Sequence, residues 1–149
     1  MPHRVPFKRS FSVVVAACAL LAGSAFAQSA SPTGLWKTID DETGKPKALV
    51  RISDVNGEMH GKIEKIFRPA EEEQNPVCEK CEGELKNQPI IGMTILSGMK
   101  PDGDDYSDGR IIDPSTGKIY KSKISLSADG KTLAVRGYIG LPMLGRTQT

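Results

Sequence analysis

The sequence is poor in the residues that build most catalytic and metal centres. It has 2 histidines, 3 cysteines and 1 tryptophan among 149 residues, and aromatic residues make up 5%. It has no G-x-S-x-G nucleophile motif, no phosphate-binding glycine loop and no H-E-x-x-H zinc motif. No Ser/His/Asp set can be argued from His60, the one histidine beyond residue 27. We therefore expect no enzymatic activity, no cofactor and no resident metal.

The chain also lacks an apolar run long enough to span a membrane. Its one long apolar run covers residues 11–22 and carries no charge, whereas a spanning helix needs about 20 apolar residues. Three basic residues precede this run, and a small-residue site, A-F-A, ends at Ala27. Because this is the three-part pattern of a secretory signal peptide, we predict cleavage after Ala27 and a periplasmic protein of residues 28–149. The alternatives are a retained anchor and a lipoprotein lipidated at Cys18.

No excess of one charge remains once this leader, residues 1–27, is removed. The whole chain has 20 Lys+Arg and 18 Asp+Glu, with a pI of about 8.4. Three of the basic residues lie in the leader, which leaves 17 basic and 18 acidic residues. The basic pI is therefore no reason to expect nucleic-acid binding. The remaining 122 residues suffice for one modest domain.

Turn signals divide residues 28–149 into short segments in which apolar and polar residues alternate. The signals lie at 41–44, 56–57, 113–117 and 129–130, and Asn-Gly at 56–57 strongly favours a hairpin. An alternation of period two is typical of half-buried strands. We predict an antiparallel all-β meander of about eight strands, in a barrel or a sandwich. Its expected core faces include Ala48, Val50, Ile52, Met59, Ile63, Phe67, Leu133, Val135 and Ile139.

A cysteine pair, Cys78 and Cys81, lies in the one segment that breaks this rhythm. That segment, from about residue 68 to residue 89, is rich in Glu, Pro and Asn. Export would place the pair in an oxidising compartment, where paired thiols form disulfides. A structural zinc site usually takes more Cys and His ligands than are present. A redox-active pair usually lies at a helix N-terminus, which lowers the thiol pKa, whereas the acidic flanks of this pair would raise it. We predict a disulfide that fastens the loop, with a metal site and a redox catalyst as alternatives.

Six motifs together resemble a bacterial secreted family of unknown function, DUF2147. They are GLWKT (34–38), GKIEKIF (61–67), NPVCEKCEGELKNQPIIGMTIL (75–96), DGRIIDPSTGKIYKSKISL (108–126), TLAVRGYIG (132–140) and GRTQT (145–149). The resemblance implies a small antiparallel up-and-down barrel of the calycin type, similar in shape to lipocalins. Members of this family usually continue past GRTQT, so we expect the last strand to be clipped at Thr149.

The resemblance also implies how the barrel closes. Gly34 and Trp36 form a G-x-W at the start of the first strand, and in lipocalin-like barrels such a Trp closes one end under an Arg from a late strand. Stacking of a guanidinium on an indole contributes about 0.5–2 kcal/mol. We assign Arg146 as the partner and Arg136 as the second candidate. In the alternative interpretation, Trp36 is plain core and Arg146 is solvated.

Two binding functions fit such a barrel. In the first, its mouth or cavity holds a small apolar molecule. In the second, the protein is an interaction or structural module of the cell envelope, with a packed core and no ligand. Either function gives a role to an apolar cluster near the chain end, as a ligand site or as a contact surface. The cluster consists of Ile139, Leu141, Met143 and Leu144.

Overall fold

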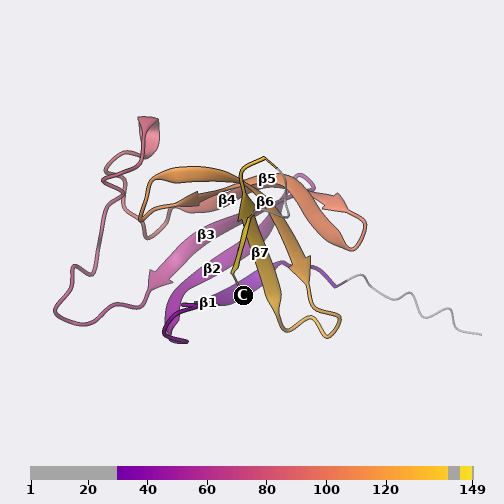
Figure 1. Cartoon of the computed structure of the whole chain (residues 1–149), viewed down its shortest axis with the longest axis horizontal. Coiled ribbons are helices and arrows are strands. Elements are labelled where there is room, and N and C mark those ends of the chain that lie inside the picture. Colours follow the sequence, from indigo (N-terminus) through magenta and orange to yellow (C-terminus); the bar gives the residue numbers. More distant parts are fainter. Residues whose placement is uncertain (1–29, 141–144, 149) are drawn as a thin grey trace, which may run out of the picture.

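The fold is one antiparallel sheet that curls into a half-barrel (Figure 1). The computed structural model describes residues 30–140 and 145–148. One short 3-10 helix, η1 (Gly83–Leu85), lies between the third and fourth strands. No helix in these ranges is long and apolar enough to cross a bilayer. The eight strands are β1 (Gly34–Ile39), β2 (Pro46–Val55), β3 (Glu58–Ile66), β4 (Thr94–Asp102), β5 (Asp105–Asp113), β6 (Lys118–Leu126), β7 (Leu133–Tyr138) and β8 (Arg146–Gln148).

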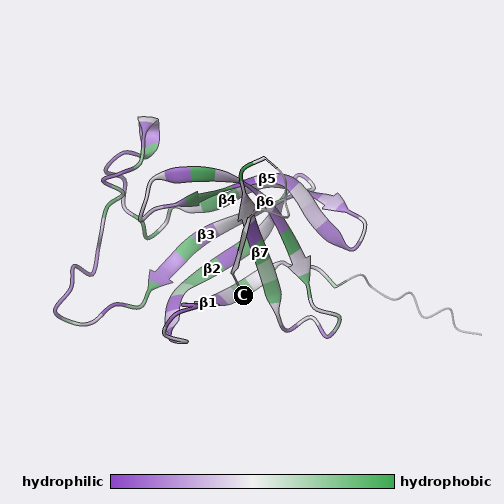
Figure 2. Ribbon diagram, viewed as in Figure 1, coloured by the Kyte–Doolittle hydropathy of each residue, from purple (hydrophilic) through white to green (hydrophobic). Residues whose placement is uncertain are grey.

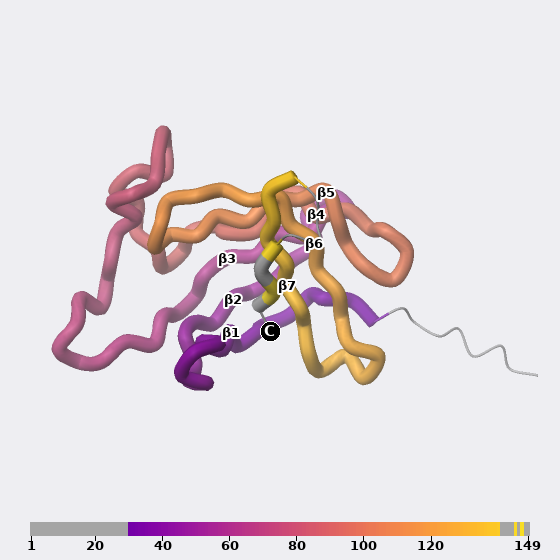
Figure 3. Tube along the Cα trace, in the orientation of Figure 1, coloured from indigo at the N-terminus to yellow at the C-terminus, as the bar shows by residue number. Residues whose placement is uncertain are grey.

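Each strand pairs with the strand that precedes or follows it in the chain. The order in the sheet is β1 to β8 without a crossover, and all seven pairings are antiparallel. Among the described residues no ladder joins β1 to β8, and Figure 3 traces the strands in chain order from the indigo β1 to the yellow-gold β7. The predicted all-β, up-and-down architecture of about eight strands is confirmed.

Tight turns join the strands where the sequence contains its turn signals. Asn56 and Gly57 have φ angles of 56° and 85°, and a type I′ hairpin turn requires positive φ at both positions. The Gly57 N–H also donates to the Asp54 carboxylate over 2.7 Å. These local interactions explain why β2 and β3 form a hairpin at this point.

The inner face of the curl holds the main hydrophobic core. Trp36 and Val135 are among the partly buried residues that pack against it. Figure 2 shows apolar and polar bands alternating along the strands, as expected when one face is buried. Met99 and Ile124 have no exposed surface, so the chain's own side chains occupy this part of the interior. The buried members are Ile52, Met59, Leu96, Met99, Ile124 and Leu133.

Two residues that the alternation placed in the core lie outside it. Phe67 is 37% exposed and Ile139 is 73% exposed. A bulge in β3 shifts its register. Ile63 lies opposite Val50 and Ile66 lies opposite Ala48, so Ile66 rather than Phe67 follows Ile63 on the inward face. β3 then ends at Ile66, and β7 ends at Tyr138. In both cases the sequence alternation continues past the end of the strand.

Candidate functional site

The predicted disulfide between Cys78 and Cys81 is confirmed, with a Cα–Cα distance of 5.4 Å. It lies within a folded segment, residues 76–93, that we call the clasp. Both cysteines are buried, with 0% and 1% of their surface exposed, and they pack with Met93 against Ile112 of β5. Within the clasp, the Cys78 N–H donates to the carbonyl of Gln88 over 2.9 Å. The disulfide therefore belongs to a second, smaller core on the outward face of the sheet.

The clasp is held against the turn between β5 and β6. The Sγ atom of Cys78 lies 3.3 Å from the carbonyl oxygen of Pro114. Gly117, with a φ of 73°, approaches the clasp so closely that an added Cβ would lie 1.9 Å from the carbonyl oxygen of Lys80. Only glycine meets both conditions without strain. This contact fixes the clasp beside the first residues of β6.

Asp113 shapes the turn on which the clasp rests. Its carboxylate accepts hydrogen bonds from the Ser115 N–H at 2.9 Å, the Ser115 hydroxyl at 2.6 Å and the Thr116 hydroxyl at 3.0 Å. Burial raises the pKa of Asp113, but these hydrogen bonds outweigh burial and leave that pKa below its usual value. The ionised carboxylate therefore stabilises the turn.

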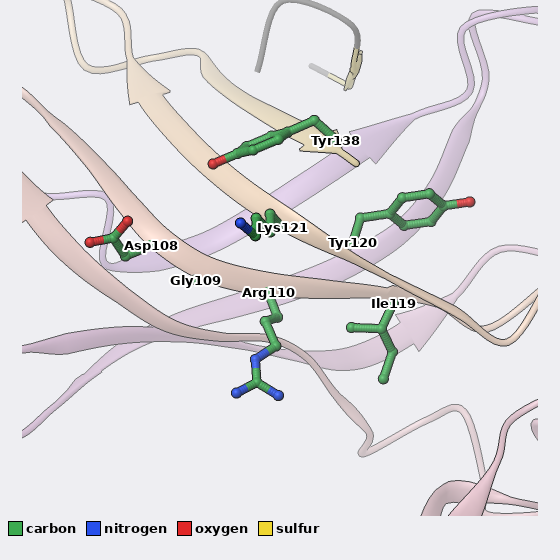
Figure 4. A pocket seen from close by; sticks show the side chains of 7 residues that line it. All are labelled: Asp108, Gly109, Arg110, Ile119, Tyr120, Lys121 and Tyr138. Atoms are coloured by element: carbon green, nitrogen blue, oxygen red, sulfur yellow. The ribbon is translucent and has the colours of Figure 1, made fainter. Parts of the chain in front are cut away.

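A hollow of about 520 Å³ lies beyond this turn, across β5, β6 and β7 (Figure 4). Arg110 on β5 is directly opposite Lys121 on β6, and Lys121 is directly opposite Tyr138 on β7. The three residues form a row across the strands. Because they alternate with the inward-facing Ile111 and with Gly137, the row lies on the outward face of the sheet. The full lining is Asp108, Gly109, Arg110, Ile119, Tyr120, Lys121 and Tyr138.

The two ends of the hollow differ in polarity. Ile119 lies at one end and is 56% exposed, although its cross-strand partner Ile112 is buried beneath the clasp. Asp108 lies at the other end, and Figure 4 shows the hydroxyl of Tyr138 directed toward that side. Asp108 itself sits in a bulge of β5 with a φ of 60°. The hollow thus offers an apolar end, a cationic middle and a carboxylate.

A second hollow, of about 420 Å³, lies beside Trp36 where the chain enters β1. The indole N–H of Trp36 donates to the carbonyl of Pro32 over 2.7 Å, and Pro32 is almost fully buried. Ala30 lies 4.0 Å from the position that a Cβ on Gly130 would occupy. The segment before β1 therefore lies near the turn between β6 and β7. The lining consists of Thr33, Gly34, Leu35, Trp36, Lys37, Gly130 and Lys131.

The model of a family described as an uncharacterised protein conserved in bacteria, DUF2147, matches residues 34–149. The chain belongs to this family. No curated protein matches the sequence. Among solved structures, the DUF2147 chain is similar to protein HP1028 from the human pathogen Helicobacter pylori, which is described as belonging to the lipocalin family. The TM-score is 0.67 at 18% identity, and the match covers 79% of this chain and 80% of that chain. The likeness shows a lipocalin-like fold.

The closure predicted for this DUF2147 fold is described only in part. Trp36 packs against the main core, and Gly34 begins β1 with a φ of 141°. Arg146 pairs through its backbone with Gly137, but its side chain lies outside the described residues, so the predicted stacking on Trp36 stays a prediction. The second candidate, Arg136, donates to the hydroxyl of Thr147 over 2.8 Å.

Most of the predicted apolar cluster near the chain end also lies outside the described residues. This applies to Leu141, Met143 and Leu144. The fourth member, Ile139, is exposed and directly follows Tyr138 of the hollow. The described residues contain no group of three or more His, Cys, Asp or Glu side chains placed to hold a metal ion.

Sequence reasoning did not single out the hollow. Its cations lie in DGRIID and KIYKSK, where each is one of several exposed charges. Arg110 and Lys121 come together only through the pairing of β5 with β6. A bulge between Tyr106 and Gly109 shifts that pairing, and a one-residue shift reverses the face of every later side chain. No local signal in the sequence indicates where this bulge falls.

Proposed function

We propose that this DUF2147 protein is a periplasmic binding protein that takes a small apolar molecule at the hollow on β5–β7. The observation that carries the proposal is the hollow itself. Its volume of about 520 Å³ falls within the roughly 300–1,000 Å³ of small-molecule sites. Ile119 supplies exposed apolar surface. The lipocalin-like fold is compatible with binding a small molecule, although a fold alone does not assign a function.

The leader pattern supports the periplasmic location. A cleaved leader gives a protein that begins at Gln28, and an oxidising compartment gives the Cys78–Cys81 disulfide. Native mass spectrometry of protein purified from the periplasm without reductant tests both. The expected mass is that of residues 28 onward less two hydrogens, with an apolar adduct. Retention of residues 1–27 would contradict the predicted cleavage.

Binding at the hollow is tested with a neutral apolar fluorophore, N-phenyl-1-naphthylamine. Replacing Ile119 with Ser removes the apolar end of the site, and burial of an Ile side chain is worth about 1.5–3 kcal/mol. We therefore expect Ile119→Ser to weaken probe binding about tenfold. Val55→Ser is the matched control, because Val55 is also exposed, at 48%, and does not line the hollow. Equal binding by the two variants would overturn this site assignment.

The second candidate function is an envelope interaction module. It is favoured by the exposure of two isoleucines: Ile119 on β6 is 56% exposed, and Ile139, just past the end of β7, is 73% exposed. Under this alternative the hollow is a contact surface for a protein. The native spectrum then shows no adduct, and cross-linking through a cysteine introduced at Ile139 captures an envelope protein that Ile119→Ser no longer captures.

A further inference from the structure

The middle of the hollow carries two cations that no carboxylate neutralises within the described part of the chain. Arg110 and Lys121 are both exposed and directly opposite each other, and neither forms an ion pair there. Like charges at opposed positions of an antiparallel pair destabilise it. Two other cations of the sheet are paired across strands, Arg51 with Glu64 and Lys123 with Asp105. The hollow is therefore complementary to an added anion.

The surroundings of the two cations define what kind of anion fits. The guanidinium of Arg110 can donate two parallel hydrogen bonds to a carboxylate, and the ammonium of Lys121 adds a point charge. Tyr138, at the end of the same row, is buried, and its hydroxyl is directed toward the Asp108 side of the hollow. Asp108 lines the far end, so the formal charge of the lining is +1. One negative charge on the ligand balances it, and a second would be repelled by Asp108.

The apolar end of the hollow defines the rest of the ligand. Ile119 is next but one to Lys121 along β6 and lies on the same outward face. An aliphatic chain attached to an anion at Lys121 can thus extend over Ile119 toward the buried core of the clasp, which begins at Ile112. We propose that the hollow binds an amphipathic monoanion, with its carboxylate between Arg110 and Lys121 and its aliphatic chain on Ile119. This inference rests on the proposed binding function.

The test compares three ligands of equal chain length on the oxidised protein: decanoate, decanol and decyltrimethylammonium. Calorimetric titration at low salt should give the tightest binding for decanoate, about tenfold tighter than for decanol. Salt should weaken decanoate binding and leave decanol binding unchanged. Decyltrimethylammonium should bind more weakly than decanol, because it brings a third cation to the site.

Two variants locate the anion. Arg110→Gln and Lys121→Gln should each weaken decanoate binding about five- to tenfold and leave decanol binding unchanged. Lys86→Gln is the control, because it removes an exposed cation of the clasp that does not line the hollow. Circular dichroism of each variant confirms that the sheet is retained, and the decanol affinity shows that the apolar site is intact.

The outcomes separate this inference from the proposed function. Equal affinity for decanoate and decanol, or an equal loss in Lys86→Gln, overturns the anion site and leaves apolar binding in place. No binding of decanol, decanoate or the neutral fluorophore overturns both. Phosphatidylglycerol vesicles provide the last comparison. Binding to these vesicles with no binding of decanoate would make the cations a lipid-surface contact and would overturn the small-molecule assignment.

Discussion

At the residue scale, Gly117 illustrates how one position can couple two distant segments. Its φ of 73° places it in the left-handed region, and its missing side chain admits the carbonyl oxygen of Lys80. The clasp and the turn between β5 and β6 are thus in direct contact, although 36 residues separate Cys78 from Pro114. The position of the clasp depends on the absence of a single Cβ.

Gly117→Ala should therefore lower the free energy of unfolding by more than the conformational term alone. A non-glycine residue in this region costs about 1–2 kcal/mol, and the overlap with Lys80 adds to it. Gly44→Ala is the control, because Gly44 has a φ of 67° and open space around its Cβ position. Urea unfolding of the two variants measures the difference. Equal losses would mean that the clasp moves aside without cost.

At the scale of elements, the clasp covers part of the outward face of the sheet. It covers Ile112 and Ile95, which would otherwise be apolar side chains on an outward face. The bridge spans a sequence separation of only 3. A bridge over so short a loop lowers the entropy of the unfolded chain, which stabilises the fold by about 2 kcal/mol. Its effect is local, because both sulfur atoms pack within the clasp's own core.

The double variant Cys78→Ala, Cys81→Ala should loosen the clasp and leave the sheet formed. Hydrogen exchange should rise at the backbone N–H groups of residues 77–93, including that of residue 78, while those of β2 and β3 keep their protection. Wild-type protein in a strong reductant should give the same pattern. Unchanged exchange across the clasp would show that packing against Met93 holds it without the bridge.

The elements also show how far the sequence predicts this fold. Strands and turns follow from alternation and from residues such as Asn56 and Gly57, because these act over a few neighbours in the chain. The disulfide follows from the spacing of its cysteines and from the leader. The contact of the clasp with Gly117 and the row from Arg110 to Tyr138 depend on registers and bulges. Those are set by packing between segments, which no local pattern records.

At the scale of the whole molecule, a set of carboxylates favours folding at neutral pH. Among the residues that the structure describes, five have pKa values below the ordinary ones of 3.8 for Asp and 4.5 for Glu, because hydrogen-bond donors favour their ionised forms. The donors come from turns at Asp40 and Asp129, and from cross-strand cations at Glu64 and Asp105. Asp113 is the most buried of the five, and its hydrogen bonds outweigh the opposing effect of burial.

Stability should therefore fall in acid. A carboxylate whose pKa is lower in the folded state contributes stability above its unfolded pKa, and that stability is lost as the pH falls through the folded pKa. The urea midpoint should decrease as the pH falls from about 5 to about 2. Asp113→Asn should show a smaller decrease, since it has no carboxylate to protonate at that turn. A midpoint that is constant or rises in acid would contradict the assignment.

The neighbour-to-neighbour order of the strands has a consequence for how the protein comes to be folded. Folding is faster when contacting residues are close in sequence, because short loops cost less entropy to close. Each hairpin from β1–β2 to β7–β8 can form once its own residues are available, and the bridge between Cys78 and Cys81 requires no finished sheet. The approach of the segment before β1 to the turn at Gly130 must wait until most of the chain is available. The molecule is thus suited to folding progressively from its N-terminus, with the approach of the segment before β1 to the turn between β6 and β7 as a late step.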